Sequence, residues 1–211
     1  MARRYEQTLR AEAAAETRRR ILDAVYQRLR AAPAEAVRVE QIAKMAGVAR
    51  STVYVIFGSR AGLFDALGED LYERSGYAHL LEAVRVEDAW ESASGGIRAG
   101  VHIFAADRDV FRALHSMEEL DPDAVGGAIR RIEEQRAEGM MWAAGRLRDQ
   151  GYLRHDVGVA EAAHIMWIQA SFEAFDLLYT GRGLSANRVA ELLVAIAERS
   201  LIDASRIPQS R

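Results

Sequence analysis

The sequence contains no cysteine, which excludes disulfide bonds, thiolate metal sites and thiol-based redox sensing. No stretch of the 211 residues approaches the roughly 18 consecutive apolar residues that a membrane-spanning helix needs. The N-terminal segment MARRYEQTLRAEAAAETRRR is charged throughout, so we expect no secretory signal and a cytoplasmic location. Lysine is nearly absent too, because Lys44 is the only lysine among 28 basic residues.

Half of the residues are apolar, enough for a substantial core in one compact domain or two small ones. Charge is distributed unevenly: residues 1–60 hold 12 basic and 6 acidic residues, whereas residues 61–211 hold 16 and 25. A basic first quarter on an acidic body indicates that one end of the protein meets a polyanion. An arginine-rich, solvated helix face would give the same asymmetry, and charge alone does not separate the two interpretations.

Apolar residues recur with a helical period along most of the chain, which predicts an all-α fold. Ile21, Val25 and Leu29 mark a first helix that ends just before Pro33. Further helices are predicted at about 40–46, 60–76, 86–106, 109–118, 122–150, 157–180 and 185–204. The pairs Gly95-Gly96 and Gly126-Gly127 lie inside helical patterns and indicate kinks, a close helix approach or weak turns.

The segment GVARSTVYVIFGSR, residues 47–60, has the β-branched and aromatic composition of a strand. A strand here would be largely apolar on both faces, and nothing else in the sequence supplies a sheet to bury it. At about 100° per residue, its more apolar residues share one side of a helix: Ala49, Val53, Ile56 and Phe57. The opposite side carries Arg50, Ser51, Tyr54 and Val55. A helix of about two turns is therefore the better interpretation.

Three helices with a tight turn at Gly47 between the last two make a helix-turn-helix, whose second helix enters the major groove of DNA. Arg50 can donate two hydrogen bonds to a guanine edge, and Val55, apolar yet outward-facing, suits a thymine methyl group. The remaining candidates suit phosphates or, for the first of them, a base: Ser51, Thr52, Tyr54 and Arg60. Each could singly be an ordinary surface residue, or for Val55 a partly buried one, but their joint spacing favours DNA binding.

This region resembles the DNA-binding signature of the TetR family of transcription regulators, in the pattern Ile42-Ala43-x-x-Ala46-Gly47-Val48-x-x-Ser51-Thr52-Val53-Tyr54-x-x-Phe57-x-Ser59-Arg60-x-x-Leu63-Phe64. Thr17-Arg18 followed by Ile21-Leu22-x-Ala24 resembles the start of the first helix of that family. The resemblance covers residues 17–65, and the remainder agrees only in length and helical character. Val39 and Ala49 depart from it, because Ser or Thr often caps the second and third helices there.

The resemblance implies a homodimer that reads a paired, palindromic operator of double-stranded DNA with two recognition helices. It also implies a C-terminal domain that binds a small, largely apolar effector and releases the DNA when it does so. It places six residues at DNA-contact positions of the family: Lys44, Arg50, Ser51, Thr52, Tyr54 and Arg60. We therefore predict a helix-turn-helix DNA-binding domain over residues 1–65, a connecting helix at about 60–76, and a ligand-binding and dimerisation domain over residues 77–211.

Within the C-terminal region, apolar helical clefts with a few polar groups are the usual small-molecule sites. The candidates for the effector site are aromatic or histidine residues: Phe104, Phe111, His115, Trp142, His164, Trp167 and Phe172. Such residues belong more often to a core or an ordinary surface than to a pocket. The last two long helices carry residues that suit an intermolecular four-helix bundle: Ala163, Ala170, Ala174, Phe175, Leu192 and Ile196. The same faces could instead cover the core of the monomer.

Catalytic signatures are scarce. Glu161-x-x-His164 is a single Glu-x-x-His unit, whereas a di-iron bundle needs two, and the sequence contains no His-Glu-x-x-His, P-loop or Gly-x-Gly-x-x-Gly. We therefore expect no enzyme, no cofactor and no metal site. The favoured hypothesis is a ligand-responsive repressor; the alternative is an all-helical small-molecule-binding protein or enzyme with a structural helix-turn-helix. Arg50, Tyr54 and Arg60 together favour the first, because a carrier has no need for them.

Overall fold

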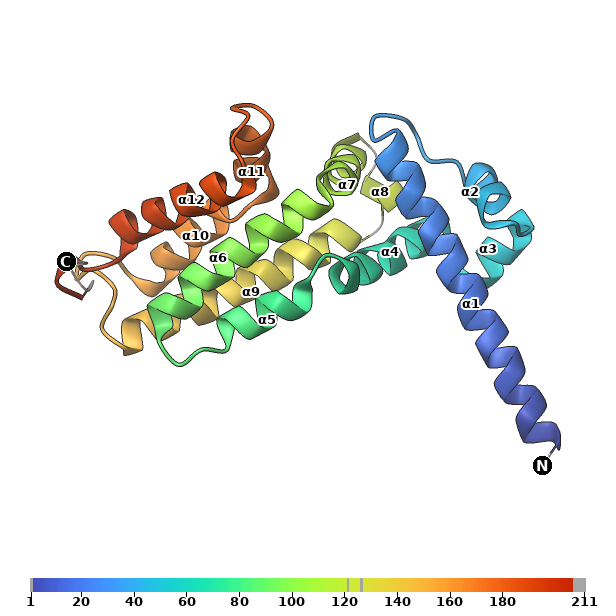
Figure 1. Cartoon of the computed structure of the whole chain (residues 1–211), viewed down its shortest axis with the longest axis horizontal. Coiled ribbons are helices and arrows are strands. Elements are labelled where there is room, and N and C mark those ends of the chain that lie inside the picture. Colours follow the sequence, from blue (N-terminus) through green and yellow to red (C-terminus); the bar gives the residue numbers. More distant parts are fainter. Residues whose placement is uncertain (1, 121, 126, 207–211) are drawn as a thin grey trace. The chain divides into compact units, whose positions relative to one another are not determined.

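The computed structural model describes residues 2–120, 122–125 and 127–206, which fold almost entirely into helices (Figure 1). Within these ranges the single β-type pairing is an isolated bridge between Leu153 and Ile202, so the all-α prediction is confirmed. None of the described helices is long and apolar enough to cross a membrane. The elements are α1 (Ala2–Ala31), α2 (Val39–Ala46), α3 (Arg50–Phe57), α4 (Arg60–Arg74), α5 (Tyr77–Val84), α6 (Ala89–Ala106), α7 (Arg108–Leu120), α8 (Pro122–Val125), α9 (Ala128–Asp149), α10 (Val159–Gln169), α11 (Phe172–Tyr179), α12 (Ala186–Leu201) and a 3₁₀ turn at Ala204–Arg206.

The chain divides into two compact units. The first unit comprises the chain up to Leu71 together with Asp109–Arg130, and the second comprises Tyr72–Arg108 and the chain from Arg131 onward. The grouping of Asp109–Arg130 with the first unit is a feature that the sequence did not indicate. The predicted division into domains at residues 1–65 and 77–211 stays a prediction.

The core of the first unit is built on the apolar stripe of α1. Ile21, Val25 and Leu29 are fully buried, as their four-residue spacing predicts. Helix α2 packs against α1, and α3 packs against α2. From α3, Val53 and Phe57 enter the core with exposed fractions of 1 % and 9 %. Because complete burial of such a side chain stabilises by about 1.5–3 kcal/mol, these anchors can hold a helix of two turns in place.

Two glycines shape the turns on either side of α3. Gly47 ends α2 in the left-handed conformation, with a φ of 66°, as predicted. Gly62 lets the first turn of α4 approach the end of α3, because a Cβ atom at this position would lie 2.2 Å from the carbonyl oxygen of Phe57. Ser59 caps α4, since its Oγ accepts a hydrogen bond from the amide of Gly62 at 2.9 Å.

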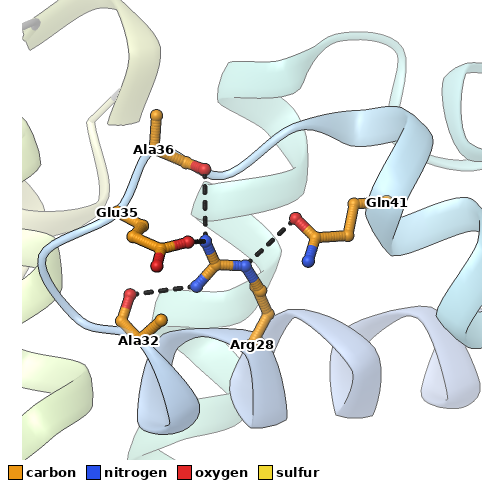
Figure 2. A network of polar contacts seen from close by, with 5 residues as sticks. All are labelled: Arg28, Ala32, Glu35, Ala36 and Gln41. Atoms are coloured by element: carbon orange, nitrogen blue, oxygen red, sulfur yellow. Dashed lines mark hydrogen bonds and ion pairs between the residues drawn. The ribbon is translucent and has the colours of Figure 1, made fainter.

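A buried arginine fixes the loop between α1 and α2 (Figure 2). Arg28 is 4 % exposed and donates through Nε to the side-chain oxygen of Gln41 at 3.1 Å. Its Nη1 donates to the carbonyl oxygen of Ala32 at 2.9 Å, and its Nη2 to the carboxylate of Glu35 at 2.9 Å. The guanidinium therefore joins the last turn of α1, the loop and the first turn of α2.

In the second unit, α6 packs against both α5 and α12. The contact with α5 depends on the glycine pair in α6. A Cβ atom on Gly95 would lie 3.4 Å from the Cβ of Ala83, and one on Gly96 would lie 3.0 Å from a methyl group of Val84. Of the three interpretations that the sequence left open for this pair, close helix approach is the one that the structure bears out.

The helix predicted over residues 157–180 is wrong as a single element. It is broken between α10 and α11, where Ala170 is the C-cap of α10 and Ser171 is the N-cap of α11. The Oγ of Ser171 accepts a hydrogen bond from the amide of Ala174 at 3.1 Å, so a side chain replaces the backbone acceptor that a continuous helix would provide.

The helix predicted over residues 122–150 is also interrupted, since α8 ends at Val125 and α9 begins at Ala128. Near the break, the amide of Gly127 donates to the carboxylate of Asp65 at 3.0 Å, a tertiary contact in place of an intrahelical one. Gly126 lies outside the described residues. Helix α5 was not predicted, because the next helix was expected to begin only at about residue 86.

Candidate nucleic-acid interface and effector site

Helix α3 presents the predicted division of side chains. Ser51 and Val55 are exposed, Val55 to 83 %, whereas Tyr54 and Thr52 are half-buried. Ala49 was predicted on the buried side and is exposed, because it precedes the helix as its N-cap and has an extended backbone. A valine that is 83 % exposed gains nothing from the core, so its side chain is available to a ligand.

Arg50 is the basic group of this surface, and its contacts are local. Its Nη2 donates to the phenol oxygen of Tyr54 at 3.4 Å, and the guanidinium lies 5.4 Å from the centroid of the Tyr54 ring. Its Nε lies 3.0 Å from a carboxylate oxygen of Glu40 in the first turn of α2. The hydrogen bond to Tyr54 and, after it, the charge of Glu40 raise the pKa of Arg50 above its ordinary value, so the group stays cationic. The contact of Glu40 with Arg50 was not predicted, because nothing in the local periodicity indicates a pair that meets across the turn.

The other two predicted basic contacts come from neighbouring helices of the first unit. Lys44 is exposed on α2, and Arg60 is half-buried in the first turn of α4. The guanidinium of Arg60 lies 5.5 Å from the centroid of the Phe64 ring, which orders its stem. The roles of all seven residues in DNA binding stay predictions at this point.

Both short helices begin without a side-chain cap. The N-cap of α3 is Ala49, as predicted, and it offers no acceptor to the first amides of the helix. For α2 the capping position is Arg38, one residue earlier than predicted, and Val39 is instead buried at 5 % exposure. Uncapped amides at a helix N-terminus keep their capacity to donate to an anion such as a phosphate.

The second unit contains an open cleft of about 600 Å³ between the α5–α6 connection and α9. Its walls are largely apolar and are formed by Val84, Arg85, Val86, Glu87, Trp142 and Arg146. Trp142 is 50 % exposed, and the guanidinium of Arg146 lies 4.9 Å from its ring centroid. Arg146 also donates through Nη2 to the carbonyl oxygen of Val86 at 2.8 Å, so one arginine fixes both the indole and the connection. Of the predicted effector residues, Trp142 lines this cleft.

Two of the other candidates belong to an aromatic cluster in the core of the second unit. Phe104 and Phe172 meet edge to face at 5.6 Å between ring centroids, and both contact Phe175. Tyr179 stacks on Phe175 at 4.9 Å. The exposed fractions of Phe104 and Phe172 are 8 % and 3 %, so their rings serve the core, which is the alternative that the sequence analysis left open.

The remaining candidates do not share one location. Phe111 is buried and His115 half-buried in the first unit, whereas His164 and Trp167 are exposed on α10 of the second. Trp167 is fixed by Arg136 of α9, whose Nη2 donates to the Trp167 carbonyl oxygen at 2.7 Å and whose guanidinium lies 5.8 Å from its ring. The structure therefore does not bring the seven predicted residues together.

The predicted dimer residues fall into two groups. Ala163 and Phe175 are buried within the same protomer, with exposed fractions of 4 % and 0 %, so they are core residues and present no surface to a partner. The other four are half-buried on α11, on α12 or just after α10: Ala170, Ala174, Leu192 and Ile196. Two large apolar residues on α10 and α11 were not predicted and are well exposed, Ile168 at 61 % and Leu177 at 70 %.

Comparison with known proteins agrees with this arrangement. A family model described as bacterial regulatory proteins, tetR family, matches residues 21–67, which span the last third of α1, all of α2 and α3, and the first half of α4. Comparison with the curated proteins finds no match.

Solved structures give the same fold. The structure of NalD, the secondary repressor of the MexAB-OprM multidrug efflux pump in Pseudomonas aeruginosa, is similar with a TM-score of 0.70 and 21 % identity, over 92 % of this chain and 99 % of that one. The fatty acid degradation regulator FadR from Bacillus halodurans gives a TM-score of 0.68 and 16 % identity, over 90 % and 97 %. The ketosteroid transcriptional regulator KstR2 of Mycobacterium tuberculosis gives 0.58 and 18 %, over 90 % and 95 %. At these identities the likeness shows a shared fold.

Proposed function

The chain belongs to the TetR family of bacterial regulatory proteins and is a DNA-binding transcription regulator, and from this premise we propose that it is a repressor that a small molecule releases from a palindromic operator. The observation that carries the proposal is the surface of α3, where Arg50, Ser51 and Val55 are exposed on a helix anchored by Val53 and Phe57. In a helix-turn-helix, this is the surface that reads base edges. That NalD, a protein of the same fold, is a repressor supports the direction of control.

In this proposal Arg50 reads a guanine, Val55 contacts a thymine methyl group, and Ser51 bonds a base or a phosphate. Thr52 and Tyr54, half-buried on the same helix, contact phosphates. Lys44 and Arg60 add phosphate contacts from α2 and α4. The protein would act in the cytoplasm, where its operator lies.

The test is a gel-shift titration on the DNA upstream of its own gene at low salt, with an unrelated duplex of equal length as the competitor. Arg50→Ala should weaken binding to the operator more than to the unrelated duplex, because it removes a base contact. Arg60→Ala should weaken both alike and reduce the dependence of log K on log salt by about one contact. Absence of any binding at low salt would refute the proposed function.

A homodimer follows from the operator symmetry, because two recognition helices must enter major grooves about 34–36 Å apart. We place the dimer interface on the surface that includes Ile168 and Leu177, together with the half-buried predicted residues on α11 and α12. Leu177→Glu should convert the dimer to a monomer in sedimentation velocity. Leu120→Glu is the matched control, because Leu120 is 86 % exposed in the first unit. A dimer that persists in the Leu177 variant places the interface elsewhere.

For the effector, we propose the cleft at Trp142, whose apolar walls suit a largely apolar ligand with a flat ring that stacks on the indole. Ligand binding there should change the fluorescence of the protein, and the change should disappear in Trp142→Phe and persist in Trp90→Phe. The same compound should release DNA in the gel shift with a coupling of about 1–3 kcal/mol. A fluorescence change that survives in Trp142→Phe places the effector elsewhere.

The alternative function, a small-molecule carrier or enzyme with a structural helix-turn-helix, is not favoured. The proteins of similar fold are named as transcriptional regulators, and we therefore propose that this protein is a regulator without catalytic activity. The gel shift separates the two, since a carrier has no sequence preference for DNA.

A further inference from the structure

The guanidinium of Arg50 is contacted from two helices. The carboxylate of Glu40 lies beside its Nε, with 3.0 Å between Nε and Oε1, and its Nη2 donates to Tyr54. A guanidinium carries five N–H groups in a fixed planar fork. Among the described residues, these contacts leave both hydrogens of Nη1 and one of Nη2, two neighbouring nitrogens of the fork, for a ligand.

That pair of donors is what a guanine edge requires. The O6 and N7 atoms of guanine accept two parallel hydrogen bonds from an arginine in the major groove, and the geometry tolerates little rotation of the fork. A long, exposed arginine side chain has many rotamers, and ordering it on binding costs free energy. An arginine that is already oriented before binding therefore keeps more of the free energy of its contact with the base. The side chain of Arg50 is 59 % exposed, so packing against the protein restricts its rotamers little.

Glu40 is attached to a fixed backbone. It precedes Gln41, whose side-chain oxygen accepts a hydrogen bond from the buried Arg28 (Figure 2), and it lies in the first turn of α2. The start of α2 is therefore tied to the last turns of α1 by a group with little access to solvent. A carboxylate on such a support can orient an arginine on the following helix.

We propose that Glu40 is a positioning residue for sequence recognition: it orients the guanidinium of Arg50 so that Nη1 and Nη2 face a guanine, and it contacts no base itself. The inference rests on the proposed base-reading role of Arg50. It has a second consequence, because a carboxylate close to the DNA repels phosphates of any sequence. Glu40 thus lowers non-specific affinity while it raises discrimination at one base pair.

The experiment begins with a duplex selected by the wild-type full-length protein from a pool of random sequences. Binding is then measured to this duplex and to variants with each base pair replaced in turn. Arg50→Ala identifies the guanine position as the one where discrimination disappears. The decisive variants are Glu40→Ala, Glu40→Gln and the double variant Glu40→Ala/Arg50→Ala. Glu69→Ala, which removes an exposed carboxylate from α4 of the same unit, is the matched control.

We expect the wild type to discriminate against a replaced guanine by about tenfold or more at the Arg50 position. Glu40→Ala should reduce that ratio to about threefold or less, leave the ratios at other positions unchanged, and strengthen binding to an unrelated duplex. Glu40→Gln should give an intermediate ratio, because its amide oxygen still accepts a hydrogen bond from the guanidinium but lacks the ionic attraction of the carboxylate. In the Arg50→Ala background, removal of Glu40 should change no ratio.

Several results would overturn the inference. One is wild-type discrimination at the Arg50 position in Glu40→Ala. An equal loss of discrimination at every position, or a fall in melting temperature beyond that of the Glu69 control, would indicate a structural role instead. If Arg50→Ala alters discrimination at no position while DNA is still bound, the premise is removed but the proposed function stands. If no duplex is selected from the pool, the proposed function fails and the inference with it.

Discussion

Replacement of Arg28 by alanine should destabilise the first unit and loosen the helix-turn-helix that it contains. The side chain of Arg28 is 5 % exposed, and its guanidinium makes three short hydrogen bonds (Figure 2). Alanine fills none of the space and replaces none of the donors, so the carbonyl oxygen of the half-buried Ala32 and the side chain of the exposed Gln41 lose their partner.

The magnitude follows from the exposure of each partner. The bond to the half-buried Ala32 comes from a charged donor and is worth about 1.5–3 kcal/mol, and the bond to Gln41 counts for less because Gln41 is exposed. The ion pair with Glu35 counts for at most about 1 kcal/mol, because the Glu35 side chain is 75 % exposed and screened by solvent. Loss of the charge also removes the cost of burying the guanidinium. The net destabilisation should therefore be about 2–4 kcal/mol, a large part of the stability of a small unit.

Two measurements test this value. Thermal unfolding followed by far-UV circular dichroism should show a lower midpoint for the transition of the first unit, by about 4–8 °C per kcal/mol for a unit of this size. Hydrogen exchange should be faster at the amides of residues 32–46, which Arg28 fixes, than in the wild type. Arg28→Lys should retain part of the stability, because it keeps the charge but cannot reproduce the fork.

The control is Arg19→Ala, which removes an arginine from the same helix that is 65 % exposed and, among the residues that the structure describes, pairs with Glu16 three residues away. It should change stability by no more than about 0.5 kcal/mol. The reasoning is refuted if Arg28→Ala unfolds at the same temperature as Arg19→Ala with unchanged exchange at residues 32–46. That outcome would mean that solvent replaces the lost hydrogen bonds at little cost.

Three further predictions concern single features of the fold. Gly62→Ala should lower the melting temperature, because its Cβ would lie 2.2 Å from the Phe57 carbonyl oxygen, whereas Gly139→Ala, with open space around it, should raise stability by up to about 1 kcal/mol; equal melting temperatures for the two variants would contradict the close approach. Ser171→Ala should cost about 1 kcal/mol in thermal unfolding by removing the cap of α11, and no loss would mean that the break does not depend on it. The hydrogen bonds from the amide of Glu91 and the phenol of Tyr152 hold the pKa of Asp88 below its ordinary value, so its carboxylate stabilises the fold above the unfolded pKa, about 3.9, and this contribution is lost as pH falls through the folded pKa. Asp88→Asn should therefore be less stable than wild type at pH 7 and equally stable near pH 2, and a difference that stays constant with pH would exclude the carboxylate as its source.

The buried and exposed sides of α3 were predictable, because both follow from spacing within one short helix. Val53 and Phe57 are buried and Val55 is exposed, as a helical period requires. Ala49 was the exception, since a wheel cannot tell that the residue precedes the first turn. The composition of residues 52–57 favoured a strand, but β-propensity reflects packing on a sheet and gives way to the pattern when no sheet exists.

The effector site was less predictable. Aromatic residues on helices serve cores and clefts equally well, so the sequence could not separate Phe104 and Phe172, which pack against Phe175, from Trp142, which lines a cleft. The dimer candidates show the same ambiguity, since Phe175 and Ala163 lie in the core of the protomer. An apolar face on a helix indicates that another surface covers it, and only the tertiary packing shows whether that surface belongs to the same protomer or to a partner.

The sequence by itself determined that the chain is helical, that residues 42–64 carry a family signature, and which side of α3 faces solvent, because these properties depend on residue identity and spacing within a few turns. The tertiary structure alone decided that Glu40 lies beside Arg50, that Arg28 fixes the loop after α1, and that the predicted helix over residues 157–180 breaks at Ser171. Each of these depends on how loops close and faces meet. Such contacts join residues whose separation along the chain has no period, so no local pattern encodes them.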